Sequence, residues 1–162
     1  GKRAMEMLGA CYTHSYDIEI VTARCFSFLG YGLPQHLAVG QLISDALYAN
    51  EITVKGDGKP VRSYLYAADL AVWLLAILLR GKNGSAYNVG SDVGMTIADH
   101  AKLVKAVLAP DKNIRILELQ TKQEKARTIY VPDISKADKE LRLKIWSPLN
   151  DAIEKSFSTH SS

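Results

Sequence analysis

Apolar positions change their spacing repeatedly along the chain, and each change marks a new element. Helical spacing runs over residues 4–16, and the short β-branched run at 18–24 is typical of a buried strand. Helical spacing returns later and predicts helices at residues 38–49, 69–80, 97–108, 133–143 and 148–157. Strand-like runs are predicted at 86–90, 114–119 and 127–132, and two more flank a turn within 51–66. Helices and strands that alternate in this way favour an α/β fold.

Local signals refine two of these helices. The helix at 69–80 is apolar nearly all round, so it is expected to be buried on most sides, with Trp73 in the core. Asp69 stands in its first turn and is interpreted as a helix cap. Thr96 and Asp99 resemble a capping box for the next helix, in which His100 is interpreted as a surface residue.

Composition narrows the class of protein. The 162 residues are 48% hydrophobic and 23% charged, as in an ordinary globular protein. The net charge of +3 is scattered, so neither nucleic acid nor a membrane surface is an expected partner. The longest apolar run, 70–79, is shorter than the roughly 20 residues that span a bilayer. Cys11 and Cys25 lack CxxC spacing, which argues against a disulfide framework or a metal site, and a cytoplasmic location is expected.

The first residues suggest a piece of a longer chain. The sequence opens GKRAME, without an initiator Met and with helical spacing already running. It contains no GxGxxG, P-loop or HExxH pattern. We therefore expect that these residues alone do not make a complete dinucleotide-binding enzyme.

Arg62 is the most informative single residue. It follows a Gly-Asp-Gly-Lys-Pro turn at 56–60 and stands among apolar and aromatic positions. A guanidinium presents paired, planar donors that fit phosphate oxygens, which a lysine does not reproduce. Arg62 is thus a candidate anion clamp at a pocket rim; the alternative is an ordinary surface or ion-paired charge.

Several motifs together resemble a known family. They are VTARCFSFLG at 21–30, GDGKPVRSYLYAADLA at 56–71, AYNVGSD at 86–92, and the TxxD helix start after them. Over about residues 2–145 the chain is similar to the C-terminal half of the extended short-chain dehydrogenases, the NAD-dependent nucleotide-sugar epimerases and dehydratases. The resemblance implies a Rossmann-type α/β fold whose dinucleotide-binding part is missing. Residues 1–24 would be a remnant of that part, and 25–162 would be mostly the substrate-binding domain.

The resemblance also assigns roles to individual residues. Lys2 resembles the lysine of a Tyr-x-x-x-Lys catalytic motif, which holds the cofactor ribose and lowers the tyrosine pKa. Arg62 matches the arginine that grips the sugar-nucleotide diphosphate, and Asn88 matches an asparagine near the same group. Ser27 replaces a usual asparagine that touches substrate phosphate. Only Arg127 could replace a second phosphate-binding arginine.

The function implied is that of dTDP-glucose 4,6-dehydratase-like enzymes, which act on a nucleoside-diphosphate hexose with bound NAD. A 4-epimerase or decarboxylase of the same family is the alternative, and a non-catalytic nucleotide-sugar-binding or interaction domain is the second one. NAD is expected in the longer parent and not on this piece alone, which lacks the Gly-rich turn. Homodimerisation through the apolar face of the helix at 4–16 is also expected.

Overall fold

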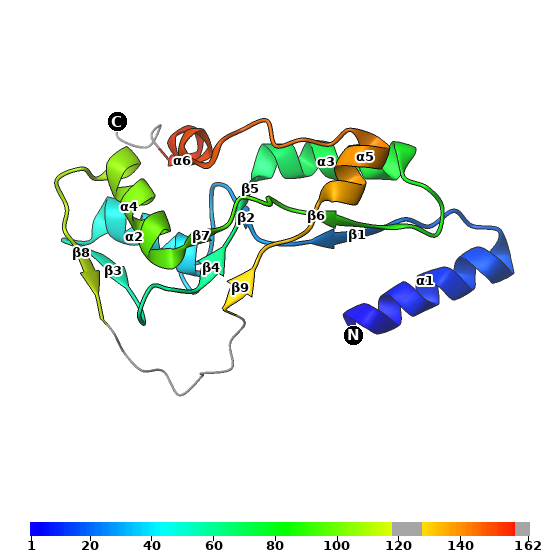
Figure 1. The fold of residues 1–162 in the computed structure, drawn as a ribbon, viewed down its shortest axis with the longest axis horizontal. Coiled ribbons are helices and arrows are strands. Elements are labelled where there is room, and N and C mark those ends of the chain that lie inside the picture. The colour runs from blue at the N-terminus through cyan, green and yellow to red at the C-terminus, as the bar shows by residue number, and fades with distance from the viewer. Residues whose placement is uncertain (118–127, 158–162) are drawn as a thin grey trace.

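The computed structural model describes residues 1–117 and 128–157, which form an elongated α/β structure with two lobes joined by short strands (Figure 1). The helices are α1 (Lys2–Tyr16), α2 (Ala38–Tyr48), α3 (Ala67–Arg80), α4 (Ile97–Leu108), α5 (Ser135–Leu141) and α6 (Leu149–Phe157). The strands are β1 (Thr22–Cys25), β2 (Phe28–Leu29), β3 (Ile52–Val54), β4 (Val61–Arg62), β5 (Leu65–Tyr66), β6 (Ala86–Val89), β7 (Met95–Thr96), β8 (Ile114–Ile116) and β9 (Ile129–Tyr130). The α/β prediction is confirmed.

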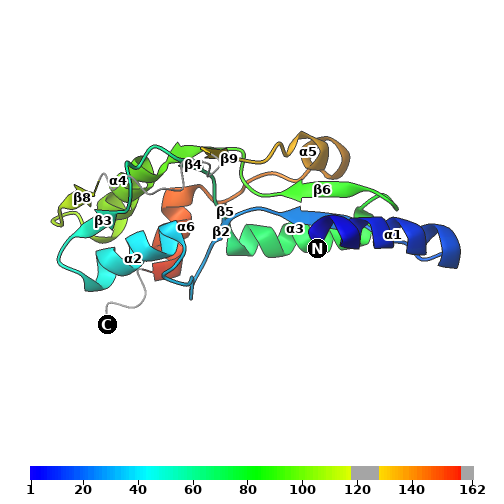
Figure 2. The same ribbon diagram turned by 90° about the horizontal axis from the view of Figure 1, so that it is seen from below.

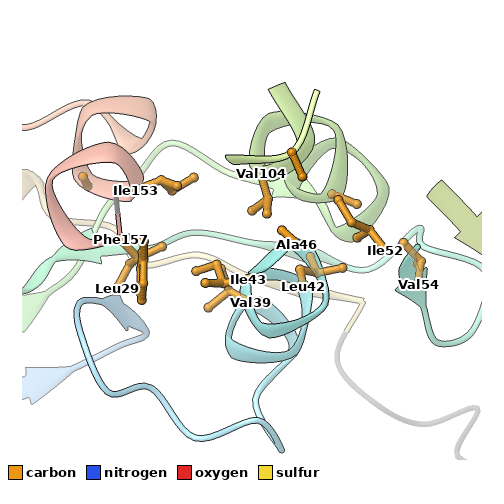
Figure 3. Packing of buried hydrophobic residues seen from close by; sticks show 13 residues of the cluster. Leu29, Val39, Leu42, Ile43, Ala46, Ile52, Val54, Val104, Ile153 and Phe157 are labelled. Atoms are coloured by element: carbon orange, nitrogen blue, oxygen red, sulfur yellow. The ribbon is translucent and has the colours of Figure 1, made fainter. Parts of the chain in front are cut away.

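One lobe, here called the α2 lobe, consists of α2, β3, α4, β8 and α6. Its strands β3 and β8 are parallel, with Ile52 opposite Ile114. Helices α2, α4 and α6 turn their apolar faces toward one another and toward β3, and Figure 3 shows the resulting cluster. Leu42 and Ile52 lie at its centre, at 2% and 0% exposure. The lobe thus closes around a core of its own.

The second lobe, here called the α3 lobe, consists of α1, β1, α3, β6 and α5. Strands β1 and β6 are parallel, with Thr22 opposite Ala86 and Cys25 opposite Val89. Its core contains Trp73, which is fully buried and donates its indole N–H to the carbonyl of Lys144 at 2.9 Å. Trp73 is therefore a core residue, as predicted.

Short strands connect the two lobes (Figure 2). Strands β2 and β5 form a parallel pair, and β4 lies between β7 and β9 in a three-stranded sheet. The two strands predicted within 51–66 do not pair with each other, because β3 joins β8 while β4 joins β7 and β9. The Gly-rich turn therefore carries the chain from the α2 lobe into the connecting sheet.

Two predictions of burial were wrong, both in the α3 lobe. The run at 18–24 forms a strand only from Thr22, and β1 is partly to fully exposed because β6 alone pairs with it in the described part of the chain. Helix α3 buries the side that carries Trp73 and Ile77, whereas Leu78 and Leu79 are 71% and 79% exposed. Apolar composition on nearly all sides did not ensure burial, because the described part of the lobe covers α3 on the side of Trp73 and Ile77 and leaves Leu78 and Leu79 exposed.

Helix starts gave one confirmation and one correction. The Thr96 hydroxyl accepts the Asp99 N–H at 3.0 Å, as a capping box requires. Asp69 does not cap its own helix: its carboxylate accepts the backbone N–H groups of Trp146 and Ser147 at 3.0 and 2.9 Å. These two hydrogen bonds anchor the segment that leads into α6, and they are shielded from water because Asp69 is only 5% exposed.

Candidate functional site

The turn before Arg62 is docked on the start of a helix. Gly56 and Gly58 have φ values of 80° and 71°, which only glycine adopts readily. The first N–H groups of α4 point at this turn, and those of Ile97 and Ala98 donate to the carbonyls of Pro60 and Gly58, each at 3.0 Å. Helix N-terminal N–H groups lack partners inside their own helix, so this contact satisfies both sides. The path of the chain into β4 is thereby fixed.

Arg62 ends the central strand of the connecting sheet. It lies opposite Met95 of β7 and Tyr130 of β9. Its Nη1 donates to the carbonyls of Val61 at 2.8 Å and Thr128 at 3.4 Å. Within residues 1–117 and 128–157 no carboxylate forms an ion pair with this guanidinium. Among the described residues its side-chain hydrogen bonds go to neutral carbonyls, so the half-buried guanidinium retains a charge that an anion can neutralise.

Aromatic stacking links Arg62 to the end of β1. The rings of Phe26 and Tyr130 stack at 4.8 Å between centroids, and Tyr130 is the β9 partner of Arg62. The Phe26 N–H donates to the carbonyl of Val89 at 2.8 Å, which extends the β1–β6 pairing by one residue. Ser27 follows, and its carbonyl accepts the Leu65 N–H at 3.1 Å. Ser27 is thus close in the fold to the segment that follows Arg62.

Asn88 lies in β6, opposite Arg24 of β1. Its Nδ2 donates to the carbonyl of Asp133 at 2.8 Å, a bond that holds β6 to the segment before α5. Two residues on, a Cβ at Gly90 would come within 2.8 Å of Pro132 and 3.0 Å of Phe26. The amide therefore has a structural partner, and contact between Asn88 and a substrate stays a prediction.

Lys2 begins α1 and lies near Cys25, the last residue of β1. One turn later, Glu6 forms a two-pronged ion pair with Arg24, at 2.6 and 2.8 Å, which attaches α1 to β1. The positive charge of Lys2 is close enough to Cys25 to act on its thiol; burial raises the pKa of that thiol, and Lys2 opposes the rise. Dinucleotides bind at the carboxyl ends of parallel strands. Contact between Lys2 and a cofactor ribose stays a prediction.

Two residues complete the comparison with the sequence. Arg127 lies outside the described residues. His100, expected on the helix surface, is buried at 1% exposure, and its Nε2 lies 3.1 Å from the carbonyl oxygen of Arg62. Its ring meets that of Tyr64 edge-on at 4.9 Å. Helical spacing contained a signal for this, because His100 stands four residues before buried Val104.

Burial lowers the pKa of His100, while its bond to the Arg62 carbonyl and the Asp99 carboxylate partly oppose that effect. A carbonyl only accepts, so the Nε2 atom must carry a proton. The ring therefore donates from Nε2 to the backbone of the candidate clamp.

Two general properties concern the described ranges alone. Residues 1–117 and 128–157 contain no group of three or more His, Cys, Asp or Glu side chains able to hold a metal ion. In the same part of the chain, no helix has both the length and the apolar character needed to cross a membrane.

Proteins of related sequence align with most of this chain. UDP-glucuronic acid decarboxylase 6 of Arabidopsis thaliana is 31% identical over 150 residues, which are 91% of this chain and 42% of the relative. UDP-glucuronic acid decarboxylase 1 of Danio rerio is 30% identical over 166 residues, with 99% of this chain and 38% of the relative covered.

Solved structures share its fold. UDP-glucose 4-epimerase of Thermotoga maritima, solved with UDP-glucose, superposes with a TM-score of 0.84 at 21% identity, over 96% of this chain and 50% of that one. The dTDP-glucose 4,6-dehydratase of Bacillus anthracis, solved with NAD, gives a TM-score of 0.78 at 18% identity, over 93% and 47% of the two chains.

A family profile agrees with these similarities. The profile of the NAD dependent epimerase/dehydratase family matches residues 1–90, more than half of the sequence. The match includes α1, the turn at 56–60, Arg62 and Asn88. The chain therefore belongs to the NAD-dependent epimerase/dehydratase family, and it spans less than half the length of the curated relatives named above.

Proposed function

We propose that the protein supplies the nucleotide-sugar site of an enzyme of this family, and that Arg62 binds the diphosphate of the substrate. The observation that carries the proposal is the setting of Arg62: a half-buried guanidinium on the central strand of the connecting sheet, bonded to carbonyls at 2.8 and 3.4 Å. Neutral carbonyls do not neutralise the positive charge of the guanidinium. A diphosphate can therefore replace these bonds, or add to them, with paired and charge-assisted hydrogen bonds. Ser27 and Asn88 are proposed to lie along the same substrate, and Arg127 is a proposed second phosphate contact.

The nucleotide is proposed to carry a hexose, because relatives with shared sequence or fold are named for UDP-glucuronic acid, UDP-glucose and dTDP-glucose. Within the family we propose the 4,6-dehydratase reaction, in which water is lost across C5 and C6 of the sugar. A decarboxylase is the second candidate, since the relatives at 30–31% identity reported above bear that name.

Lys2 is proposed to hold the ribose of NAD, which when bound takes a hydride from the sugar. The position of Lys2 near Cys25, the last residue of β1, fits this contact, and its charge would favour the ionised form of a neighbouring tyrosine. Residues 1–24 are proposed to be part of the dinucleotide-binding domain, and residues 25–162 to be mostly the substrate domain, although β6 within that range pairs with β1. The 162-residue chain alone is expected neither to bind NAD measurably nor to turn over a nucleotide sugar.

Calorimetric titration tests the nucleotide-sugar site. Uridine, UMP, UDP and UDP-glucose differ in steps, so their affinities separate the contributions of base, phosphates and sugar. We expect a large gain from uridine to UDP in the wild-type protein, and a much smaller gain in Arg62→Ala. Equal gains in both proteins would show that Arg62 does not bind the diphosphate. In the full-length protein, the product formed from dTDP-glucose, UDP-glucose or UDP-glucuronic acid would separate dehydratase from decarboxylase and epimerase.

A further inference from the structure

His100 is a buried polar residue for which the proposed substrate contacts leave no role. It lies in α4, at 1% exposure, on the side that faces the strand segment carrying Arg62. Its Nδ1 has no hydrogen-bond partner among the described residues, and neither has the buried hydroxyl of Ser63, the residue after Arg62. Buried polar atoms without partners are costly, so a residue such as leucine would suit this place better if packing were the sole requirement.

The polar contact that His100 does make is directed at Arg62. Its Nε2 donates to the Arg62 carbonyl at 3.1 Å, and its ring packs edge-on against Tyr64, two residues further along the segment. The same helix also holds the chain before Arg62, through the bonds from Ile97 and Ala98 to the turn. Helix α4 therefore holds the chain at two points, the turn before Arg62 and the carbonyl of Arg62. His100 makes the second of these contacts.

The position of the ring is in turn fixed by the cap of its helix. Thr96 and Asp99 exchange hydrogen bonds of 3.0 and 2.7 Å, which set the first turn of α4 immediately before His100. Thr96 also belongs to β7, where it lies opposite Val61. The donor is thus mounted on a helix start that is built into the same sheet as Arg62.

We infer that His100 is a positioning residue: its Nε2–H fixes the carbonyl of Arg62 where β4 ends, and so sets the direction of the guanidinium toward the diphosphate. The inference rests on the proposed function. It extends that function by naming a residue that acts on affinity without touching the substrate.

Three substitutions test this role. His100→Leu keeps an apolar body but removes the donor, and we expect the affinity for UDP-glucose to fall about 3- to 10-fold, the equivalent of one net hydrogen bond. His100→Gln offers an amide N–H at a similar reach and is expected to restore most of the affinity. Val104→Ala, one turn further along α4 in the apolar core, is the matched control. It should lower the melting temperature without changing affinity.

Amide hydrogen exchange gives a readout that needs no ligand. Exchange in residues 61–66 is expected to rise in His100→Leu, to return toward wild type in His100→Gln, and to stay unchanged in Val104→Ala. Unchanged exchange in this segment in His100→Leu would overturn the positioning role, whatever the affinities show.

Arg62→Ala distinguishes failure of this inference from failure of the proposed function. If Arg62→Ala weakens UDP-glucose binding and His100→Leu does not, the site stands and the role of His100 is wrong. If neither substitution changes affinity, the proposed diphosphate clamp fails, and with it the effect of His100 on binding. Loss of affinity in His100→Leu that His100→Gln does not restore would also contradict a role as hydrogen-bond donor.

Discussion

The α2 lobe and the α3 lobe differ in how much of the apolar surface of their helices they bury. In the α2 lobe, the helices enclose β3 and bury Leu42 and Ile52 at 2% and 0% exposure. In the α3 lobe, α1 buries no residue, and α3 leaves Leu78 and Leu79 at 71% and 79% exposure. The first lobe meets its own packing needs, whereas the second presents apolar faces that its two-stranded sheet does not cover. Because the chain spans less than half of its curated relatives, we propose that the exposed face of α3 packs against further parts of a longer protein.

Truncating one leucine in each lobe is the strongest way to break this comparison. Leu42→Ala removes a buried side chain from a closed core and is expected to lower the free energy of unfolding by about 2–5 kcal/mol. Leu78→Ala removes a side chain that is 71% exposed, and a change within about 0.5 kcal/mol is expected. Urea denaturation of both variants measures the difference. A loss in Leu78→Ala as large as that in Leu42→Ala would show that the face of α3 is covered in solution.

The sequence predicted the elements of the α2 lobe better than those of the α3 lobe. Helical spacing at 38–49 and 97–108 places α2 and α4 within a residue at each end, because each has a polar face and an apolar face. The pattern of α3 predicted burial on most sides, because hydropathy reports what a helix can bury and not which neighbours it meets. Strand partners were also beyond prediction, because the pairing of β4 with β9 joins residues far apart in the sequence.

The candidate site was predicted in part for a similar reason. Arg62 stood out through its local setting, a Gly-rich turn followed by a guanidinium among aromatic residues. His100 did not, because its significance depends on a contact across 38 positions of the sequence. The anchoring role of Asp69 was missed likewise, since its backbone partners lie 77 and 78 positions away.

The exposed apolar face of α1, in the α3 lobe, is expected to cause self-association. Apolar side chains on α1, Met5, Leu8 and Tyr12 among them, are 72%, 58% and 49% exposed, as the helical pattern at 4–16 predicted. We expect concentration-dependent association through this helix, and Leu8→Glu should shift the protein toward monomer, because a charge at the contact opposes its desolvation. Light scattering over a range of concentrations measures the effect, with Lys102→Glu on the exposed face of α4 as the control. A wild-type protein that stays monomeric at high concentration would contradict it.

A smaller effect is expected on the pH dependence of stability. It comes from His100, which lies in α4 of the α2 lobe. Burial lowers the pKa of His100 from its ordinary value of 6.5, so the unfolded chain takes up the proton first as the pH falls. The free energy of unfolding should therefore decrease as the pH falls below 6.5 toward the lowered pKa. Carboxyl groups with lowered pKa, such as that of Asp99, contribute stability that is lost only at lower pH, below their ordinary value of 3.8.

Urea denaturation at several pH values between 7 and about 5 measures how the free energy of unfolding changes with pH. We expect the titration of His100 to cause this change. His100→Leu is expected to flatten it. An equal slope in both proteins would assign the proton uptake to another group.

The central claim, that Arg62 binds the diphosphate of a nucleotide sugar, is tested most directly by the affinity of Arg62→Ala for UDP-glucose, measured together with its melting temperature. We expect a loss of about 2–5 kcal/mol of binding free energy, because truncation removes one partner of a charge-assisted pair. Arg62→Lys should recover only part of it, since an ammonium cannot form the paired bonds of a guanidinium. The melting temperature should change little, because the guanidinium has no ion-pair partner in the described part of the chain. Affinity near that of the wild type in a folded Arg62→Ala protein would contradict the claim.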